Sequence, residues 1–473
     1  MSAGFRTFNP QLNCWNDEVY QCTSESILSQ WLNEIPFAQK GYREKSISER
    51  ASFLEEIYLQ LTQSKAEIKE TYMIESGLSE VRFEAEWQRT MSTILDFAQY
   101  LRSNYQEEKS IHIPSENIRI IKRKYPIGPV LVLGSSNFPL AYSTIGGDTV
   151  AAFASGCCVI VKAHPMHVGT SRRVAECIQE AVKKCQLAER TFTHVIDEGT
   201  NIAQQLCVSD VVQAVGFTGS YNGGKALMDL AQSRKQPIPV FAEMGSLNPM
   251  IILDGLSVSK QKEFAQKIAL SITNDAGQFC TKPGVIFIPK TSIGQSFYKE
   301  LKQVMLEMQV VPMLHPRIHQ QFELRKKSIS EQNEVQLFEY PYNTEGIQGK
   351  WALCETDLLD FDNHSMMKEE VFGPFSLIVW YNSESALKEV VLSLGGQLTG
   401  TVIFPEESSS YESWISLLSD KVGRIILNGV PTGVRVVETM QHGGPFPASS
   451  DPRYTAVGTD SMNRFQKEVS IQS

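Results

Sequence analysis

Short apolar runs alternate with helical stretches from residue 127 onward, and this alternation limits the fold more than any other feature of the chain. Strands that alternate with helices form a parallel sheet covered by helices on both faces. The first series predicts strands at 128–134, 158–162, 192–196 and 211–217 and helices at 148–154, 171–184 and 221–232. A second series begins near residue 250 and predicts strands at 285–288, 376–381, 400–404 and 424–427 and helices at 261–274, 293–308 and 384–392. The expected fold class is therefore α/β, with two such units.

The segments outside these two series differ in pattern. Residues from about 24 to 105 carry apolar side chains at helical spacing, so helices are expected there. Residues 111–125 alternate between apolar and polar side chains around a turn, which predicts a half-exposed hairpin. The polar tail, 446–473, contains FQKEVSIQ and could add an edge strand to a sheet of another subunit.

Composition and charge narrow the functional classes. A chain of 473 residues can form two or three domains, and its 42% hydrophobic and 21% charged content is typical of a soluble globular protein. The net charge of −9 without a long basic run argues against a nucleic-acid partner, and no run approaches the ~20 apolar residues of a membrane span. No apolar signal core opens the sequence, and the nine cysteines lack paired spacing, so a reducing, cytoplasmic location is expected. No histidine pair has the pattern of a zinc site, and no metal is expected.

One cysteine and one glutamate stand out as candidates for chemistry. Cys280 lies in GQFCTKPG (277–284), a loop between a helical stretch and an apolar run, where nearby amides can lower a thiol pKa and donate to an oxyanion. Glu243 lies in the apolar phrase FAEMG, where burial of a carboxylate is costly without a partner or a task. A thiol and a carboxylate base are the groups needed to form and hydrolyse a thioester. Taken singly, the cysteine could be a small core residue and the glutamate half of an ion pair.

Three further phrases lie at strand ends or turns. Asn137, in GSSNFPL, follows a predicted strand; Asn and Pro are common in turns, but the amide could also donate to an alkoxide. The turn at Gly219 and Ser220 leads from a strand into a helix, which can place backbone amides near a phosphate, although an ordinary strand-to-helix turn has the same pattern. The third phrase, KEEVFGPF (368–375), would alone be a turn with two surface acids.

These motifs occur together in the order found in the aldehyde dehydrogenase superfamily, which the chain resembles from about residue 25 to the end. The phrases GSSNFPLAYSTIGG (134–147), VKAHPMHVGTS (161–171) and residues 440–459 resemble its α-ketoglutaric semialdehyde (2,5-dioxopentanoate) dehydrogenase branch. Near relatives of that branch include NADP-dependent fatty aldehyde dehydrogenases. The resemblance implies oxidation of a small aldehyde to a carboxylic acid, with NADP or NAD as cofactor.

The resemblance also assigns roles to individual residues. Cys280 would be the nucleophile, Glu243 would activate the water that releases the acid, and Asn137 would stabilise the oxyanion together with the Cys280 amide. Two departures from the family pattern are Ser246, where a second glycine is usual, and Ser136, where many members have tryptophan. The latter implies a differently shaped substrate mouth. The residues implied to line the substrate tunnel are Tyr142, Phe279 and Thr281.

The cofactor residues implied by the resemblance come from several segments. They are Lys162 at the adenosine ribose, Gly219 and Ser220 near the pyrophosphate, Glu370 at the nicotinamide ribose and Phe372 beside the ring. Pro165 occupies a position where NAD-preferring relatives commonly have a glutamate that repels a 2′-phosphate. Because that repulsion is absent and His164 could assist when protonated, we expect NADP to be used at least as well as NAD.

The sequence says less about the identity of the substrate than about the type of reaction. A dicarboxylate semialdehyde needs a cation near the tunnel mouth, and Arg435 is a candidate, although an exposed loop arginine is the more ordinary interpretation. The alternatives are a medium- or long-chain fatty aldehyde, a CoA-acylating reaction or a catalytically silent member. The presence of Glu243 argues against the CoA-acylating class, whose members usually lack it.

The architecture implied by the resemblance has three parts. A Rossmann-like cofactor domain would comprise residues 1–108 and 126–245, and an α/β catalytic domain residues 246–438. A small β element, 109–125 and 439–473, would bridge subunits in a homo-oligomer, either a dimer or a tetramer.

Overall fold

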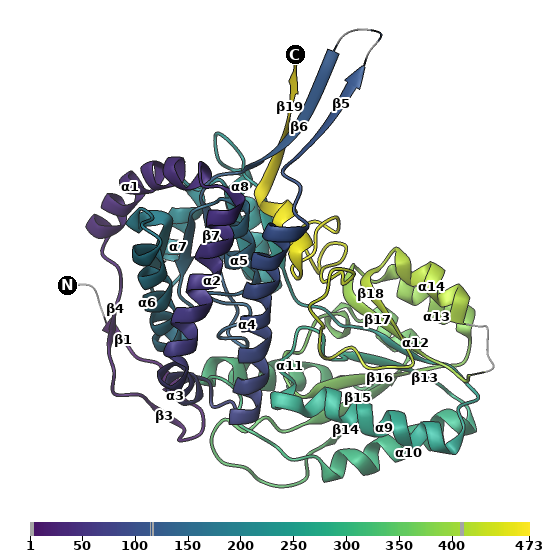
Figure 1. Cartoon of the computed structure of the whole chain (residues 1–473). Coiled ribbons are helices and arrows are strands. Elements are labelled where there is room, and N and C mark those ends of the chain that lie inside the picture. The colour runs from purple at the N-terminus through teal and green to yellow at the C-terminus, as the bar shows by residue number, and fades with distance from the viewer. Residues whose placement is uncertain (1–3, 114, 116–117, 407–410) are drawn as a thin grey trace.

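The computed structural model describes residues 4–113, 115, 118–406 and 411–473. Two sheets form the centres of two halves that lie beside each other, and a narrow third sheet projects from the molecule (Figure 1). The α/β fold class expected from the sequence is confirmed. No helix among the described residues is long and apolar enough to cross a membrane.

The first sheet has five parallel strands in the order β11-β10-β7-β8-β9. Its strands are β7 (Val130–Leu133), β8 (Val159–Lys162), β9 (Phe192–Val195), β10 (Ala214–Thr218) and β11 (Val240–Glu243). The chain builds outward from β7 to β9 and then returns to add β10 and β11 on the other side. In such sheets ligands bind outside the carboxyl ends of the strands where the strand order reverses, which here is between β7 and β10.

Helices surround this sheet and share a core with it. Those before the sheet are α1 (Glu25–Arg43), α2 (Ile47–Gln63), α3 (Lys65–Ser76) and α4 (Glu80–Ser103), and those within it are α5 (Gly147–Ser155), α6 (Val168–Lys184), α7 (Asn201–Val208) and α8 (Tyr221–Gln232). The buried rings of Phe53 in α2 and Phe153 in α5 meet edge to face, with centroids 5.1 Å apart. Helix α4 packs against both α2 and α5, and it supplies one wall of the site.

The second sheet has seven strands in the order β14-β15-β16-β13-β12-β17-β18, with only β14 antiparallel to its neighbour. Its strands are β12 (Met250–Ile252), β13 (Val285–Pro289), β14 (Gln336–Glu339), β15 (Ala352–Asp357), β16 (Phe375–Tyr381), β17 (Gln397–Ile403) and β18 (Val422–Leu427). The helices of this half are α9 (Val258–Thr273), α10 (Ser292–Glu307), α11 (Pro316–Ser330), α12 (Leu358–Asn363), α13 (Glu384–Ser393) and α14 (Tyr411–Ser419).

The third sheet joins the expected hairpin to the tail. Its antiparallel strands are β5 (Glu108–Ile113), β6 (Ile118–Pro126) and β19 (Gln466–Gln472), in the order β19-β6-β5. The tail strand, which could add an edge strand to a sheet of another subunit, pairs in this structure with β6 of its own chain. Segment 439–465 does not join this sheet but packs against both halves, with Met244 N donating to Ala448 O and Gly396 N to Phe446 O.

Several elements were not anticipated from the sequence. They include α7, α11, α14, β11 and β15. The strand β11 has four residues, VFAE, and ends in the carboxylate of Glu243. Helix α11 is largely polar and is capped by the His315 ring, which accepts a hydrogen bond from Arg317 N. The expected strand 211–217 begins later, at Ala214, because Val211 lies in a turn.

Candidate active site

The residues singled out for chemistry meet where the two large sheets face each other. Asn137 follows β7 and Glu243 ends β11, so both lie at the carboxyl edge of the first sheet. Cys280 precedes β13 and Glu370 precedes β16, so both lie at the amino edge of the second. The Asn137 side-chain amide donates to Gln278 O at 2.8 Å and links the two edges directly.

The loop that carries Cys280 is held in an uncommon backbone conformation. After α9, the residues Asp275, Ala276 and Gly277 have φ values of 47°, 54° and 62° in succession. Side chains rarely adopt this left-handed region, and such strain persists only where the surroundings enforce it. A side chain at Gly277 would also collide with the carbonyl oxygens of Ile272 and Gly373, so glycine is required there.

Hydrogen bonds from outside the loop enforce this conformation. The Asn248 side-chain amide donates to Cys280 O at 2.8 Å and to Lys282 O at 2.9 Å. Gln278 Oε1 accepts a hydrogen bond from Leu314 N at 3.0 Å. Asn248 is fully buried in the segment between β11 and β12, and its only local sequence signal is its position before Pro249.

Arg82 on α4 is a second support that the sequence did not reveal. Its guanidinium donates to Asp275 Oδ2 at 2.8 Å, to Glu86 Oε2 at 2.8 Å and to Asn137 O at 3.2 Å. Glu86 is itself buried, and its other oxygen accepts the backbone N–H groups of Leu140 and Ala141. One arginine therefore joins the strained Cys280 loop, the Asn137 loop and α4.

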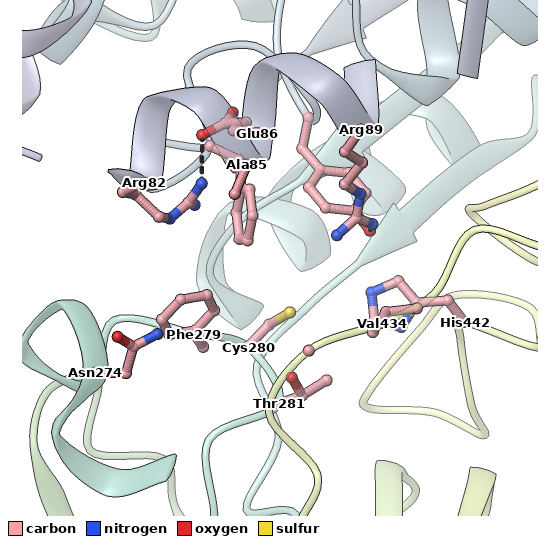
Figure 2. Close-up of a pocket in the computed structure, with 13 residues that line it drawn as sticks. Arg82, Ala85, Glu86, Arg89, Asn274, Phe279, Cys280, Thr281, Val434 and His442 are labelled. Atoms are coloured by element: carbon pink, nitrogen blue, oxygen red, sulfur yellow. Dashed lines mark hydrogen bonds and ion pairs between the residues drawn. The ribbon is translucent and has the colours of Figure 1, made fainter. Parts of the chain in front are cut away.

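The Cys280 thiol faces a cavity of about 220 Å³. Figure 2 shows its sulfur directed into the space between the loop and α4. Burial raises the pKa of this thiol to about 12, and the nearby carboxylates of Glu370 and Glu243 act in the same direction. The Arg89 and Arg424 guanidinium groups partly oppose this rise. Cys280 is therefore a protonated thiol near neutral pH in the structure described.

The Glu243 carboxyl is buried at the end of β11. Burial raises the pKa of its carboxyl well above the ordinary value, with Arg464 opposing and Asp148 reinforcing the rise. Its Oε2 atom is buried without a hydrogen-bond partner among the described residues. Buried polar atoms are seldom left unpaired, so this oxygen is positioned for something other than a fixed protein contact.

Lys282 and Glu370 are two further charged residues near the cysteine, and each influences the pKa of the other. Lys282 Nζ donates to Phe375 O at 2.6 Å, and burial lowers the pKa of this ammonium to about 8. Burial raises the pKa of the Glu370 carboxyl to about 7, while Lys282 opposes the rise. A side chain at Gly245 would collide with the Glu370 carboxylate, so this carboxylate lies close to the segment that carries Glu243.

Three of the residues expected to bind the cofactor, Lys162, Gly219 and Ser220, lie at the carboxyl edge of the first sheet, whereas Glu370 and Phe372 precede β16 of the second. Lys162 ends β8, and Ser220 caps α8, its hydroxyl accepting from Gly223 N at 3.3 Å. Gly219 N donates to Glu243 O at 3.0 Å. In the part of the chain described, Lys162 Nζ has no hydrogen-bond or ion-pair partner. An unpaired lysine and a helix N-terminus beside the point where strand order reverses are suited to a phosphate-bearing dinucleotide.

His164 and Pro165 lie directly beyond Lys162, where a short 3₁₀ turn begins. The His164 ring stacks on His167, with centroids 5.2 Å apart, and accepts a hydrogen bond from Met166 N. Burial, together with His167 and Lys162, lowers the pKa of His164 well below its ordinary value. The ring is neutral at pH 7, so it adds no positive charge beside Lys162.

The cavity wall is built from both halves and from the tail segment. Tyr142, Phe279 and Thr281 line it, where the sequence placed the substrate. Arg435 is exposed and, within the described chain, is not among the lining residues, although its neighbours Gly433 and Val434 are. The remaining lining residues are Arg82, Ala85, Glu86, Arg89, Phe138, Asn274, Cys280 and His442. Phe372 lies in the loop before β16, outside this cavity.

The fold and the site together define a class. The chain belongs to the aldehyde dehydrogenase family, whose family model matches residues 2–445. It is therefore an oxidoreductase that acts on aldehydes.

Two named relatives are similar over most of the chain. The α-ketoglutaric semialdehyde dehydrogenase of Acinetobacter baylyi is 35% identical over 488 residues, an alignment that covers 98% of this chain and 91% of that protein. The α-ketoglutaric semialdehyde dehydrogenase 2 of Azospirillum brasilense is also 35% identical and covers 91% and 84% of the two chains.

Solved structures share the fold at lower identity. The glyceraldehyde-3-phosphate dehydrogenase of Methanocaldococcus jannaschii, complexed with NADP, has a TM-score of 0.84 at 18% identity, and the match covers 100% of both chains. A betaine aldehyde dehydrogenase of Staphylococcus aureus, in complex with NAD+, has a TM-score of 0.86 at 15% identity and covers 100% of this chain and 94% of its own.

Proposed function

We propose that this enzyme oxidises α-ketoglutaric semialdehyde to 2-oxoglutarate through a thioester on Cys280. The observation that carries the proposal is the convergence of Cys280, Glu243 and Asn137 from three separate segments on one junction between the sheets. The choice of substrate is supported by the names of the two relatives that are 35% identical.

The chemistry follows from the groups at the junction. Cys280 loses its thiol proton to water and its sulfur adds to the aldehyde carbon, giving a thiohemiacetal alkoxide. The Asn137 side-chain amide has two N–H donors; one is bound to Gln278 O, and the other can stabilise the alkoxide with the Cys280 backbone N–H. Loss of hydride from the same carbon leaves a thioester. Glu243 then takes a proton from water, which attacks the thioester, releases the carboxylate and restores the thiol.

The cofactor we propose is NADP or NAD, which supplies the hydride acceptor. Lys162, Gly219 and Ser220 would hold its adenosine ribose and pyrophosphate, because they place an unpaired ammonium and a helix N-terminus together. Glu370 and Phe372, before β16, would contact the nicotinamide ribose and ring. Two family structures of the same fold were solved with NADP and with NAD+.

The assembly we propose is a homo-oligomer in which the projecting sheet of β5, β6 and β19 contacts a second copy. The three-part division, with residues 1–108 and 126–245, 246–438, and 109–125 with 439–473, remains our proposed domain organisation. The projection of the third sheet beyond the two halves supports a bridging role for it (Figure 1).

Substitution of Glu243 by Gln tests the thioester route. The variant should give one equivalent of reduced cofactor and then stall, with steady-state turnover lowered at least about hundredfold, because the base for hydrolysis is lost. Mass spectrometry of the quenched enzyme should find the acyl group on Cys280. Glu412→Gln, at an exposed position on α14, is the matched control and should turn over normally. Unchanged turnover of Glu243→Gln, or formation of acyl-CoA when CoA replaces water, would contradict the proposal.

A further inference from the structure

The cavity wall carries one arginine, Arg89, that has no counter-ion among the described residues. Arg89, on α4, donates to the Tyr142 hydroxyl, and no carboxylate lies within ion-pair distance of it in the described chain. Its guanidinium lies over two rings, 4.9 Å from the Tyr142 centroid and 5.8 Å from that of Phe138. A guanidinium has five N–H donors, so most of its donors remain free while the rings fix its orientation.

Another arginine on the same face of α4 provides the contrast. Arg82 lies seven residues earlier, about 10 Å along the helix, and also lines the cavity. It is ion-paired with Glu86 and Asp275 and donates to Asn137 O as well. The same residue type is therefore neutralised at one end of the cavity wall and left unpaired at the other.

No other charged group in the wall neutralises Arg89. Glu86 is the only carboxylate among the residues described as lining the cavity, and its two oxygens already accept from Tyr72, Arg82, Leu140 and Ala141. His442 is buried, and its pKa is lowered to about 3, so the ring is neutral. Arg424 donates to the carbonyls of Pro431 and Gly433, which fixes the wall segment and adds a second positive charge behind it. The residues described as lining the cavity therefore carry one more positive charge than negative, with Arg82 and Arg89 against Glu86.

We infer that Arg89 binds a carboxylate at the far end of the substrate, so that the site selects short aldehydes with an anionic terminus. A planar guanidinium with free donors matches a carboxylate in two parallel hydrogen bonds. An alkyl chain at the same place would remove water from an unpaired charge without replacing its hydrogen bonds, which is unfavourable. Figure 2 shows the Arg89 side chain and the Cys280 sulfur facing the same space, with α4 on one side and the cysteine loop on the other. This inference rests on the proposed function and assigns its substrate selectivity to one residue.

The test compares succinic semialdehyde with butanal, which has the same four carbons and no charge. For the wild-type enzyme, kcat/KM should be higher for the carboxylated aldehyde. In Arg89→Leu, the ratio of the two kcat/KM values should fall about hundredfold, mostly through KM, because a charge-assisted contact to the ground state and transition state alike is lost. Arg89→Lys keeps a cation and should recover at least about a tenth of the wild-type ratio. An unchanged ratio in Arg89→Leu would overturn the inference.

Two comparisons separate a specific loss of preference for the carboxylated aldehyde from a general loss of activity. Arg102→Leu removes an arginine from the same helix, where it is exposed and paired with Glu55, and should leave the ratio unchanged. The wild-type enzyme can also be given methyl 4-oxobutanoate, the methyl ester of succinic semialdehyde, which requires no variant to fold. A wild-type preference for the ester over the acid would overturn the inference.

The outcome distinguishes this inference from the proposed function. If the wild-type enzyme oxidises both aldehydes through Cys280 but the Arg89 variants keep the wild-type ratio, the inference is wrong and the thioester chemistry stands. If the wild-type enzyme oxidises neither of these aldehydes nor α-ketoglutaric semialdehyde with NADP or NAD, the proposed function itself is wrong and the inference falls with it.

Discussion

The two ends of the cavity differ in how firmly their functional groups are held. At the Cys280 end, the loop is clamped by Asn248, Asn137 and Arg82 and contains residues held in the left-handed region. At the Arg89 end, the guanidinium makes one hydrogen bond to the protein and rests on two rings. The contrast indicates that the geometry proposed for bond making is fixed by the fold, whereas the arginine proposed to bind the rest of the substrate is largely free to do so.

Removal of the Cys280 sulfur, at the firmly held end of the cavity, should have the largest effect on activity. Cys280→Ala keeps the clamped loop but loses the nucleophile, so kcat should fall at least about a thousandfold for every aldehyde. Cofactor binding, measured by equilibrium titration, should change little. Cys14→Ala, at an exposed cysteine, is the control and should retain activity. Retention of more than about a hundredth of the wild-type kcat would show that the thioester route through Cys280 is incorrect.

The two arginines of α4 should separate stability from selectivity. Arg82→Leu leaves the buried Glu86 carboxylate without its cation and releases Asp275, so the free energy of unfolding should fall by about 3 kcal/mol. Arg89→Leu breaks no ion pair, and its unfolding free energy should change by less than about 1 kcal/mol. Denaturant unfolding of both variants beside Arg102→Leu provides the measurement. Equal destabilisation by Arg82→Leu and Arg89→Leu would show that the Cys280 end and the Arg89 end of the cavity do not differ in how firmly their groups are held.

The pH dependence of alkylation should report the environment of the Cys280 thiol. Because burial raises its pKa to about 12, the thiolate fraction without cofactor should grow about tenfold per pH unit across pH 7 to 10. A free thiol, with a pKa of about 8.5, should level off near pH 9 to 10. The rate of iodoacetamide labelling is measured at each pH for Cys280, by peptide mass spectrometry, and for glutathione as the free thiol. A Cys280 curve that levels off with glutathione would mean that burial does not control this thiol.

Cofactor preference should show the smallest effect. Lys162 is unpaired and Pro165 replaces a potential acidic neighbour, so NADP should be used at least as well as NAD. The advantage should be only a few-fold, because repulsion is removed while His164, being neutral, adds no attraction. The ratio of kcat/KM for the two cofactors at one aldehyde concentration tests this. A preference for NAD above about a hundredfold would show that residues other than Pro165 decide the choice.

Short sequence motifs predicted most of the residues proposed for the chemistry. Cys280, Glu243 and Asn137 lie in short motifs, and the strand-helix alternation placed those motifs near the edges of the sheets. Asn248, Arg82 and Arg89 were missed because their importance comes from contacts far along the chain. Arg82, for example, reaches Asp275 across 193 positions. The sequence alone does not show whether an arginine in a helix is ion-paired or unpaired. Arg435 was a candidate only because it lies in a loop.

The tail also sets an order for folding on the ribosome. Met462 and Phe465 belong to the core of the first half, and Arg464 pairs with Asp148 across 316 positions of sequence. Residues 466–472 complete the sheet begun by β6. The first half is synthesised well before these partners, so it emerges with part of its core uncovered and an unpaired strand edge. Its final packing must wait until the second half has been made, and this interval is when the nascent chain most needs protection from aggregation.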